Sequence, residues 1–423
     1  PRSKQIIQRY YAMRICVLGL GHIGLPTAIM LASVGHEVVG VDIKEEIVSM
    51  IGKGNSHINE PGLDKLLKEV VNSGRLRTNS FPVESDAFII AVPTPLTNSS
   101  PPHCDLSYIR SAATSIIPVL RQGNLVILES TSPPGTTEEV LVPILERSGL
   151  KAGKDFYVAY CPERVLPGRI IEEITHNARI IGGIDRQSAN KAKELYESFV
   201  KGGIYLTDAK TAEMVKLAEN AFRDLNIAFA NELSRICYKL GVDVWEVINL
   251  ANKHPRVNIL KPGPGVGGHC IAVDPWFIVE KTPDESKLIR TAREINDSQP
   301  QFVFERIKEL ISSIEKPKVA ILGVAYKGNT GDTRESPAFK VINLLREHGC
   351  EISIYDPYVK DYEDPEGVFD DADVIILLRD HLIFRELNPS LIAERVRSRI
   401  SFDTRGILDK RRWESIGFTV ETL

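Results

Sequence analysis

Runs of consecutive apolar residues alternate along the first half of the chain with segments in which apolar residues recur every three or four positions. The apolar runs lie at 14–20, 36–43, 86–95, 124–135 and 155–163. Continuous apolar runs are typical of strands buried on both faces of a parallel sheet, and the segments between them are predicted helices. The alternation therefore predicts a doubly wound α/β domain, which we place at residues 1–205.

The pattern becomes uninterruptedly helical between residues 208 and 240, where the sequence contains neither proline nor glycine. Asp208 is expected to cap the N-terminus of this helix and Gly241 to end it. At about 1.5 Å per residue, the helix would be roughly 50 Å long. Further helix is expected at 242–253. We therefore predict a helical central domain at 206–310, with the long helix as its spine.

The strand–helix alternation returns after Lys316. Four strands and one helix are predicted, with the strands at 318–326, 351–358, 371–378 and 399–406 and the helix at 335–349. We place this third domain at 311–423. The expected fold class is thus α/β, with two Rossmann-like, doubly wound parallel-sheet domains joined by the helical central domain.

Composition and charge argue against nucleic acid and membranes as binding partners. The chain has 423 residues, 43% hydrophobic and 26% charged, with a formal net charge of −4. Such a balance offers no basic surface for nucleic acid or for an anionic membrane. No apolar run reaches the roughly 18 residues that span a bilayer. Residues 1–13 are basic but lack the apolar core of a secretion signal, so we expect a short packed helix or a partly ordered tail.

The six cysteines are far apart and include no Cys-x-x-Cys pair. In a chain of this length, that spacing is typical of reduced, intracellular thiols and not of a disulfide framework or a zinc site. We therefore expect a cytoplasmic protein without a bound metal.

A glycine motif follows the first predicted strand. Gly19, Gly21 and Gly24 form G-x-G-x-x-G, which makes a tight turn, lets a pyrophosphate approach the backbone and allows close helix packing. Asp42, at the end of the second strand, is placed to bind a ribose 2′-hydroxyl and to repel a 2′-phosphate. The motif predicts NAD and not NADP, although Lys44 lies close by. A purely structural glycine turn is the alternative.

Five further polar residues are candidate site residues. Thr94 and Thr131 follow strand ends, the edge where such sheets bind ligands, although turn chemistry alone would also explain them. Glu163 also follows a strand and is either a surface carboxylate or a general base. Lys216 and Asn220 lie four residues apart and share one face of the long helix. Apolar neighbours favour partial burial of Lys216, whereas a solvated side chain is the usual alternative.

A second glycine-rich segment, PGPGVGGHC, ends at Cys270. Its glycine density suits a loop that passes close to a ligand, and a thiolate there would be a strong nucleophile. Asp274 is within reach if the chain turns, whereas His269 would point the other way in an extended segment. A buried structural cysteine is the alternative. A metal site made from these three residues lacks a further pair of ligands.

A third loop, residues 323–337, has no dinucleotide motif. It carries Lys327 and Arg334 ahead of a helix start at Ser336, and Arg405 follows a later strand of the same domain. Cations at a helix N-terminus predict a site for a pyrophosphate that is not that of NAD. A surface loop with scattered charges is the alternative.

The chain resembles the UDP-glucose/GDP-mannose dehydrogenase family along essentially its whole length. The motifs that carry the resemblance are GLGHIGLP, VPTP, STSPPGTT, PERVLPG, AEMVKLAENAFRDLNIAFANEL, PGPGVGGHCIAVDPWF and AYKGNTGDTRESP. Within the family, AYCPERVLPGRI, HPRVNILKPG and GVGGHCIAVDPWFIV look most like members that oxidise UDP-N-acetyl-D-mannosamine. UDP-N-acetylglucosamine and UDP-glucose are the alternative substrates.

The resemblance implies a set of catalytic residues: Cys270, Lys216, Asn220, Asp274, Glu163 and Thr131. Cys270 would be the nucleophile and Asp274 its acid/base neighbour. Lys216 and Asn220 would stabilise oxyanions, with Lys216 also a candidate base. The last two residues of the set would serve the water that hydrolyses a thioester.

The resemblance also implies two sets of binding residues. Those for NAD are Gly19, Gly21, His22, Ile23, Gly24, Asp42, Thr94 and Thr131. Those for the UDP-sugar are Glu163, Arg164, Val165, Lys216, Asn220, Arg223, Arg256, Asn258, Gly267, Lys327, Arg334 and Arg405. Arg256 is similar to a residue that enters the active site from the partner subunit of a homodimer.

The implied reaction is a four-electron oxidation of a C6 alcohol to a carboxylate, which supplies uronates for polysaccharide biosynthesis. It proceeds through a thiohemiacetal and a thioester on Cys270 and uses two NAD⁺ per sugar. A one-step dehydrogenase or epimerase would not need Cys270. A non-catalytic nucleotide-sugar sensor would bind UDP-sugar without reducing NAD⁺, and the intact set of catalytic residues argues against it.

Overall fold

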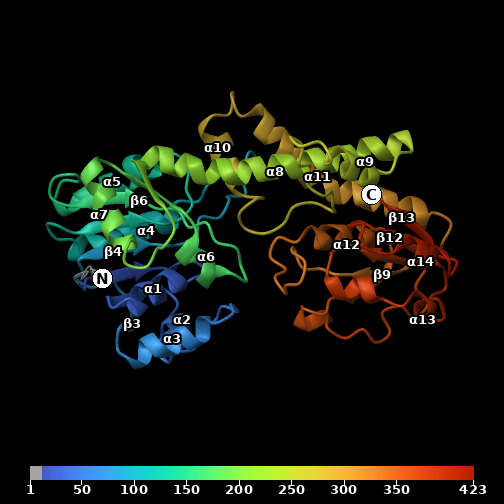
Figure 1. The fold of residues 1–423 in the computed structure, drawn as a ribbon, viewed down its shortest axis with the longest axis horizontal. Helices are drawn as coiled ribbons and strands as arrows, with labels where there is room; N and C mark the ends of the chain where they lie inside the picture. The colour runs from blue at the N-terminus through green and yellow to red at the C-terminus, as the bar shows by residue number, and fades with distance from the viewer. Residues whose placement is uncertain (1–11) are drawn as a thin grey trace, which may run out of the picture. The chain divides into compact units, whose positions relative to one another are not determined.

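The structure, a computed structural model, describes residues 12–423 (Figure 1). The expected N-terminal helix or tail falls mostly on residues 1–11, which lie outside this range. Contacts divide the chain into two units. The first ends at Ala218 and also includes Trp276–Lys281; the second comprises Glu219–Pro275 and Thr282–Leu423. The three-domain boundaries expected from the sequence remain a prediction.

The first unit is built on an eight-stranded sheet of order β3-β2-β1-β4-β5-β6-β7-β8. Its strands are β1 (Arg14–Leu18), β2 (Glu37–Val41), β3 (Leu76–Asn79), β4 (Ala87–Ile90), β5 (Leu125–Leu128), β6 (Tyr157–Tyr160), β7 (Arg179–Gly183) and β8 (Ile204–Asp208). Neighbours pair in parallel except β6 and β7, which are antiparallel. The sequence did not indicate this reversal.

Helices cover both faces of this sheet. They are α1 (Gly24–Ser33), α2 (Glu45–Gly52), α3 (Leu63–Asn72), α4 (Ser107–Ile116), α5 (Val142–Leu145), α6 (Ile170–His176) and α7 (Arg186–Tyr196), with short turns η1 (Ile117–Val119), η2 (Thr137–Leu141) and η3 (Glu146–Ser148). Alternate residues of β1 enter different cores: Ile15 and Val17 join one apolar cluster, Cys16 and Leu18 the other. Burial on both faces explains the continuous apolar run and confirms the doubly wound arrangement.

The predicted long helix is present as α8 (Ala209–Leu240). Asp208 caps it, because its Oδ1 accepts a hydrogen bond from the Thr211 backbone N at 2.8 Å. Gly241 follows in the left-handed conformation with φ +67°. The other helices of this region are α9 (Val244–Ala251), α10 (Asp274–Lys281) and α11 (Lys287–Leu310). Both α8 and α10 contribute residues to the two units.

The second unit contains a five-stranded parallel sheet of order β10-β9-β11-β12-β13. Its strands are β9 (Lys318–Leu322), β10 (Glu351–Tyr355), β11 (Val374–Leu377), β12 (Ile400–Asp403) and β13 (Thr419–Thr422). Its helices and turns are α12 (Pro337–Glu347), η4 (Lys360–Tyr362), η5 (Leu382–Glu386), α13 (Pro389–Ala393) and α14 (Lys410–Glu414). The fold class expected from the sequence is therefore confirmed. From residue 12 onward, no helix combines the length and apolarity needed to cross a membrane.

Candidate active site

The glycine motif forms a tight turn between β1 and α1. Gly19 adopts φ +92°, and its N donates to Val41 O at 2.8 Å. A side chain at Gly24 would collide with the Gly19 carbonyl, whereas a Cβ at Gly21 would meet no atom within 4 Å. The turn thus needs glycine at positions 19 and 24 for its own shape, and it leaves open space at Gly21. Because that space adjoins a helix N-terminus, these residues fit the pyrophosphate of NAD.

Asp42 closes this turn from the end of β2. Its Oδ2 accepts from the Leu20 N and its Oδ1 from the Lys44 N, each at 3.0 Å. The carboxylate is therefore fixed at the edge where a ribose would bind. His22 is exposed and Ile23 is half-buried beside the same turn.

The two predicted threonines are joined directly. Thr94 Oγ1, beyond β4, donates to the Thr131 carbonyl, beyond β5, at 2.7 Å. Next to Thr131, Ser130 Oγ donates to Val92 O, also at 2.7 Å. The loops after these adjacent strands are therefore held together at the ligand-binding edge of the sheet.

Glu163 is buried, and each of its carboxylate oxygens accepts a hydrogen bond. Oε2 accepts from Arg179 Nη2 at 2.6 Å, and Oε1 from the Arg164 backbone N at 2.7 Å. The surface-carboxylate alternative is therefore wrong. Arg164 points its Nη2 at the Ala178 carbonyl, and Val165 packs against the core.

A second acid behind Glu163 escaped the sequence analysis. Glu129, at the end of β5, accepts from Thr27 Oγ1 at 3.1 Å and from the Tyr196 hydroxyl at 2.6 Å. It lies 3.9 Å from Arg179 Nη1, so one buried guanidinium serves two carboxylates. Burial raises the pKa of Glu129 to about 7. Its one sequence signal is an acid at the end of a continuous apolar run.

Lys216 is 8% exposed, which confirms its predicted partial burial. One turn earlier on α8, Glu213 is buried and accepts from Gly135 N at 2.5 Å, Thr137 N at 2.8 Å and Thr137 Oγ1 at 2.6 Å. Burial raises the pKa of Glu213 to about 7. The beginning of α8 is thereby tied to the loop that follows β5 and carries Thr131.

In the second unit, the chain turns immediately after Cys270. The Asp274 N donates to the Cys270 carbonyl at 2.8 Å, and Asn220 Nδ2 donates to Asp274 Oδ2 at 2.5 Å. Asp274 is buried and opens α10, whereas Cys270 is exposed. The buried-cysteine alternative is therefore wrong, because Cys270 is exposed. Among residues 12–423, no group of three His, Cys, Asp or Glu could hold a metal ion.

The glycines before Cys270 let this loop lie against the loop after β9. A Cβ at Gly267 or Gly268 would come within 2.9 Å or 2.8 Å of Tyr326, and the Gly268 N donates to Arg334 O at 3.2 Å. Arg405, after β12, donates to the Pro262 carbonyl at 3.1 Å. The cysteine loop and two of the predicted nucleotide-sugar residues are thus hydrogen-bonded within one unit.

The predicted cations of this unit differ in their surroundings. Arg334 forms an ion pair with Asp332, and its Nε donates to both carboxylate oxygens, at 2.8 Å to Oδ1 and 3.0 Å to Oδ2. Arg405 Nη2 also reaches Asp380 Oδ2 at 3.3 Å. Lys327 is half-buried in the loop after β9.

Arg256 and Asn258 lie elsewhere on the second unit, beside an exposed face of α8. They line a groove of about 290 Å³ together with Phe222, Leu225, Asn226, Phe229, Val257 and Ile259. Arg223 is exposed on the same helix.

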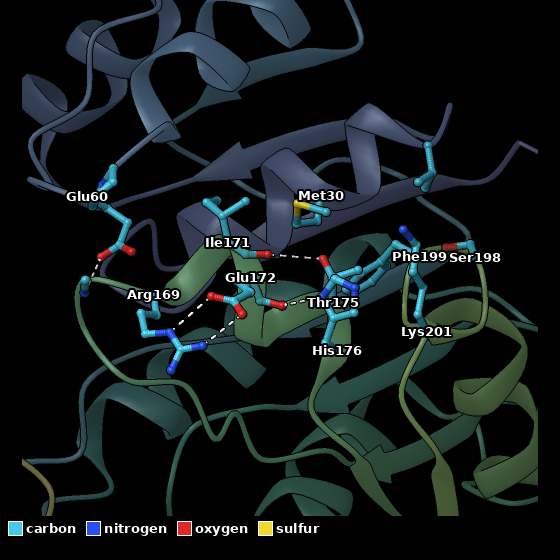
Figure 2. A pocket seen from close by; sticks show the side chains of 13 residues that line it. Met30, Glu60, Arg169, Ile171, Glu172, Thr175, His176, Ser198, Phe199 and Lys201 are labelled. Carbon is cyan, nitrogen blue, oxygen red and sulfur yellow. Dashed lines mark hydrogen bonds and ion pairs between the residues drawn. The ribbon is translucent and has the colours of Figure 1, made fainter.

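A larger groove of about 640 Å³ lies in the first unit, between α1, α6 and residues 198–201 (Figure 2). Glu60, on its wall, accepts from Gly168 N at 2.8 Å and Ile170 N at 2.7 Å and so fixes the start of α6. Arg169 and Glu172 pair at 2.8 Å in the same wall. No predicted site residue lines this groove.

Comparison with known proteins agrees with this architecture. The UDP-glucose/GDP-mannose dehydrogenase family matches in three segments: its NAD binding domain at residues 13–200, its central domain at 210–298 and its UDP binding domain at 320–410. The UDP-N-acetyl-D-mannosamine dehydrogenase of Methanocaldococcus jannaschii is 52% identical over 97% of this chain and 96% of its own. The NDP-N-acetyl-D-galactosaminuronic acid dehydrogenase of Ralstonia nicotianae is 48% identical over 94% and 97%.

A solved structure is similar over the same length. The UDP-D-ManNAc dehydrogenase of Pyrococcus horikoshii has a TM-score of 0.91 and 46% sequence identity, covering 97% of this chain and 99% of its own. The dinucleotide turn, the accessible cysteine and the cations of the second sheet each fall within a segment that the family matches. On sequence, fold and site together, the chain belongs to the UDP-glucose/GDP-mannose dehydrogenase family, whose cofactor is NAD.

Proposed function

We propose that the protein oxidises the C6 alcohol of UDP-N-acetyl-D-mannosamine to the carboxylate. The observation that carries this proposal is the exposed Cys270, which ends a loop bonded to the UDP-binding segment and whose carbonyl accepts a hydrogen bond from the backbone N of Asp274, the partner of Asn220. The names of the full-length relatives support the choice of sugar.

The first oxidation needs a base to remove the C6 hydroxyl proton as the C6 hydride leaves; Lys216 and Asp274 are the candidates. NAD, which the Gly19–Gly24 turn and Asp42 would hold, would supply the hydride acceptor for each oxidation. The Cys270 thiolate then attacks the aldehyde carbon and forms a thiohemiacetal, whose oxyanion Lys216 and Asn220 stabilise. Loss of the second hydride leaves a thioester on Sγ.

Hydrolysis of the thioester is assigned to Glu163 and Thr131. Glu163 is fixed by Arg179 and by the Arg164 N, so its carboxylate is held in one orientation to take a proton from water. The water oxygen adds to the thioester carbon, the C–S bond breaks, and Cys270 is regenerated as the carboxylate leaves. Because this chemistry needs a reduced thiol, we place the enzyme in the cytoplasm.

The decisive experiment is the yield of NADH per sugar across a panel of UDP-sugars. We expect two NADH per UDP-N-acetyl-D-mannosamine and none with Cys270→Ala. One NADH per sugar would favour a one-step dehydrogenase, and UDP binding without NADH would favour a sensor. Faster turnover of UDP-N-acetylgalactosamine, UDP-N-acetylglucosamine or UDP-glucose would correct the sugar but leave the chemistry in place.

We further propose a homodimer in which Arg256 acts on the partner's substrate. Phe222, Phe229 and Ile236 of α8 are spaced by seven residues, lie on one side of the helix and are 70%, 47% and 46% exposed. Exposed apolar patches of this kind mark association surfaces. Arg256 lines the same groove as the two phenylalanines, Phe222 and Phe229.

A further inference from the structure

Arg379 lies at the edge of the second sheet where the UDP-binding loops begin. It follows β11, as Lys327 follows β9 and Arg405 follows β12, and the carboxyl ends of parallel strands share one edge. Gly323, the residue after β9, has φ +84° and packs against the Arg379 side chain. A side chain at Gly323 would collide with the Cβ of Arg379, so the glycine lets the two loops approach closely.

This guanidinium is buried, and two of its three nitrogens have no hydrogen-bond acceptor in the described chain. Arg379 is 5% exposed, and its Nε and Nη2 are buried atoms without a hydrogen bond. The Asp380 Oδ1 lies 4.0 Å from Nη1, beyond hydrogen-bond distance. A buried cation normally has its donors satisfied, because otherwise the loss of hydration destabilises the folded protein.

The neighbouring carboxylates are already engaged. Asp380 Oδ2 accepts from Arg405 Nη2 at 3.3 Å. Asp356 Oδ2 accepts from Val324 N at 2.7 Å and Ala325 N at 3.0 Å, and lies 3.0 Å from His381 Nε2. Burial, and secondly repulsion from Arg405, lower the pKa of Arg379 to about 9. The neighbouring acids therefore leave Nε and Nη2 of Arg379 without an acceptor.

We propose that Arg379 is a further ligand of the substrate's diphosphate, completing a cluster with Arg405 and Lys327. A diphosphate supplies the multiple anionic oxygens that a planar guanidinium binds in pairs. The inference rests on the proposed function, because it assumes that the second unit binds a UDP-sugar. It makes the ligand the acceptor for the two guanidinium nitrogens that the protein leaves without a hydrogen bond.

The proposal predicts opposite effects on stability and on binding. Arg379→Met should raise the melting temperature of the ligand-free protein, because it removes a buried cation whose Nε and Nη2 have no hydrogen-bond acceptor. The same change should weaken UDP binding roughly 10- to 100-fold, as expected for a lost charged hydrogen bond. The loss should be large for UDP, smaller for UMP and absent for uridine, all measured by calorimetry.

Arg306→Met is the matched control. Arg306 is 7% exposed in the same unit, but it pairs with Glu309 at 2.7 Å and with Glu421 at 3.4 Å. Its replacement should lower the melting temperature and leave UDP affinity unchanged. Arg379→Gln, which keeps two donors without the charge, provides a second variant if Arg379→Met fails to fold.

Unchanged UDP affinity in a folded Arg379 variant would overturn the proposal, as would an equal loss for uridine and UDP. Failure of the unmodified protein to bind UDP would instead overturn the proposed function. A normal two-NADH yield with unaltered UDP affinity in Arg379→Gln would reject this inference alone.

Discussion

At the scale of single residues, burial decides which side chains have unusual chemistry. Cys16 and Cys161 are fully buried, and burial raises the pKa of each thiol to about 12, so neither supplies a thiolate near neutral pH. Cys270 is exposed. Glu129 and Glu163 share Arg179 at 3.9 Å and 2.6 Å, so Glu163 forms the shorter ion pair. The same residue type therefore has different roles because its surroundings differ.

Cofactor preference should depend on Asp42. Asp42→Ser removes the ribose ligand and the repulsion of a 2′-phosphate, so the preference for NAD⁺ over NADP⁺ should fall by roughly 1.5–3 kcal/mol. The measurement is kcat/KM for each cofactor at saturating UDP-sugar. Replacement of the exposed neighbour Glu45 by serine is the control and should leave the ratio unchanged. An unaltered ratio in Asp42→Ser would mean that another group selects the cofactor.

Glu129 should make stability depend on pH. Its pKa is raised from 4.5 to about 7 by burial, so the folded state holds this proton more tightly than the unfolded state. Its contribution to stability is therefore greatest below pH 4.5 and falls by about 3 kcal/mol as pH rises to 7. Glu129→Gln cannot ionise, so its unfolding free energy relative to the unmodified protein should rise over this range. Glu213 titrates similarly in both proteins and cancels. A difference that is independent of pH would contradict the assignment.

At the scale of helices and strands, apolar periodicity predicted most of the fold. Nine strand-like runs correspond to β1, β2, β4, β5, β6, β9, β10, β11 and β12, and the long helix begins and ends where Asp208 and Gly241 indicated. The strands that escaped prediction are β3, β7, β8 and β13. The first and last of these are short edge strands with polar residues, and β7 ends in Gly182 and Gly183, so none forms a continuous apolar run.

The candidate site was predictable where residues lie in motifs and unpredictable where partners are distant in sequence. Gly19, Cys270 and Lys327 could be predicted as site residues because each lies in a recognisable loop motif. Glu213 and Arg379 sit inside ordinary helical and strand patterns, and their importance comes from contacts that no local spacing reveals. A buried charge becomes informative when its neighbours are known.

The hydrogen bonds of Glu213 should stabilise the contact between α8 and the loop after β5. Glu213→Ala leaves Gly135 N, Thr137 N and Thr137 Oγ1 without their acceptor, at a cost of roughly 2–4 kcal/mol. NAD⁺ affinity should fall as well, because Thr131 belongs to that loop. Chemical denaturation and cofactor titration measure the two effects. The exposed Glu232 of the same helix is the control, and Glu232→Ala should change stability by less than about 0.5 kcal/mol. Equal effects of the two variants would show that the Glu213 contacts contribute little.

At the scale of the whole molecule, the proposed dimer makes a test by complementation available. Arg256→Ala and Cys270→Ala should each be nearly inactive. If Arg256 acts on the partner's substrate, a hybrid dimer retains one site with both native residues, so random pairing should restore about a quarter of full activity. Differential tagging must first show that subunits exchange. Exchange without recovery would mean that Arg256 acts within its own chain or outside catalysis.

Helices α8 and α10 also limit how the molecule can be divided. The boundary between the two units falls inside α8, between Ala218 and Glu219, and again inside α10, between Pro275 and Trp276. A fragment cut at either boundary would expose a severed helix, and helices of fewer than about a dozen residues are marginal in water. The sugar-nucleotide half is therefore not a cassette that can be exchanged at a linker. Swapping specificity between relatives calls for grafting individual loops onto an intact chain.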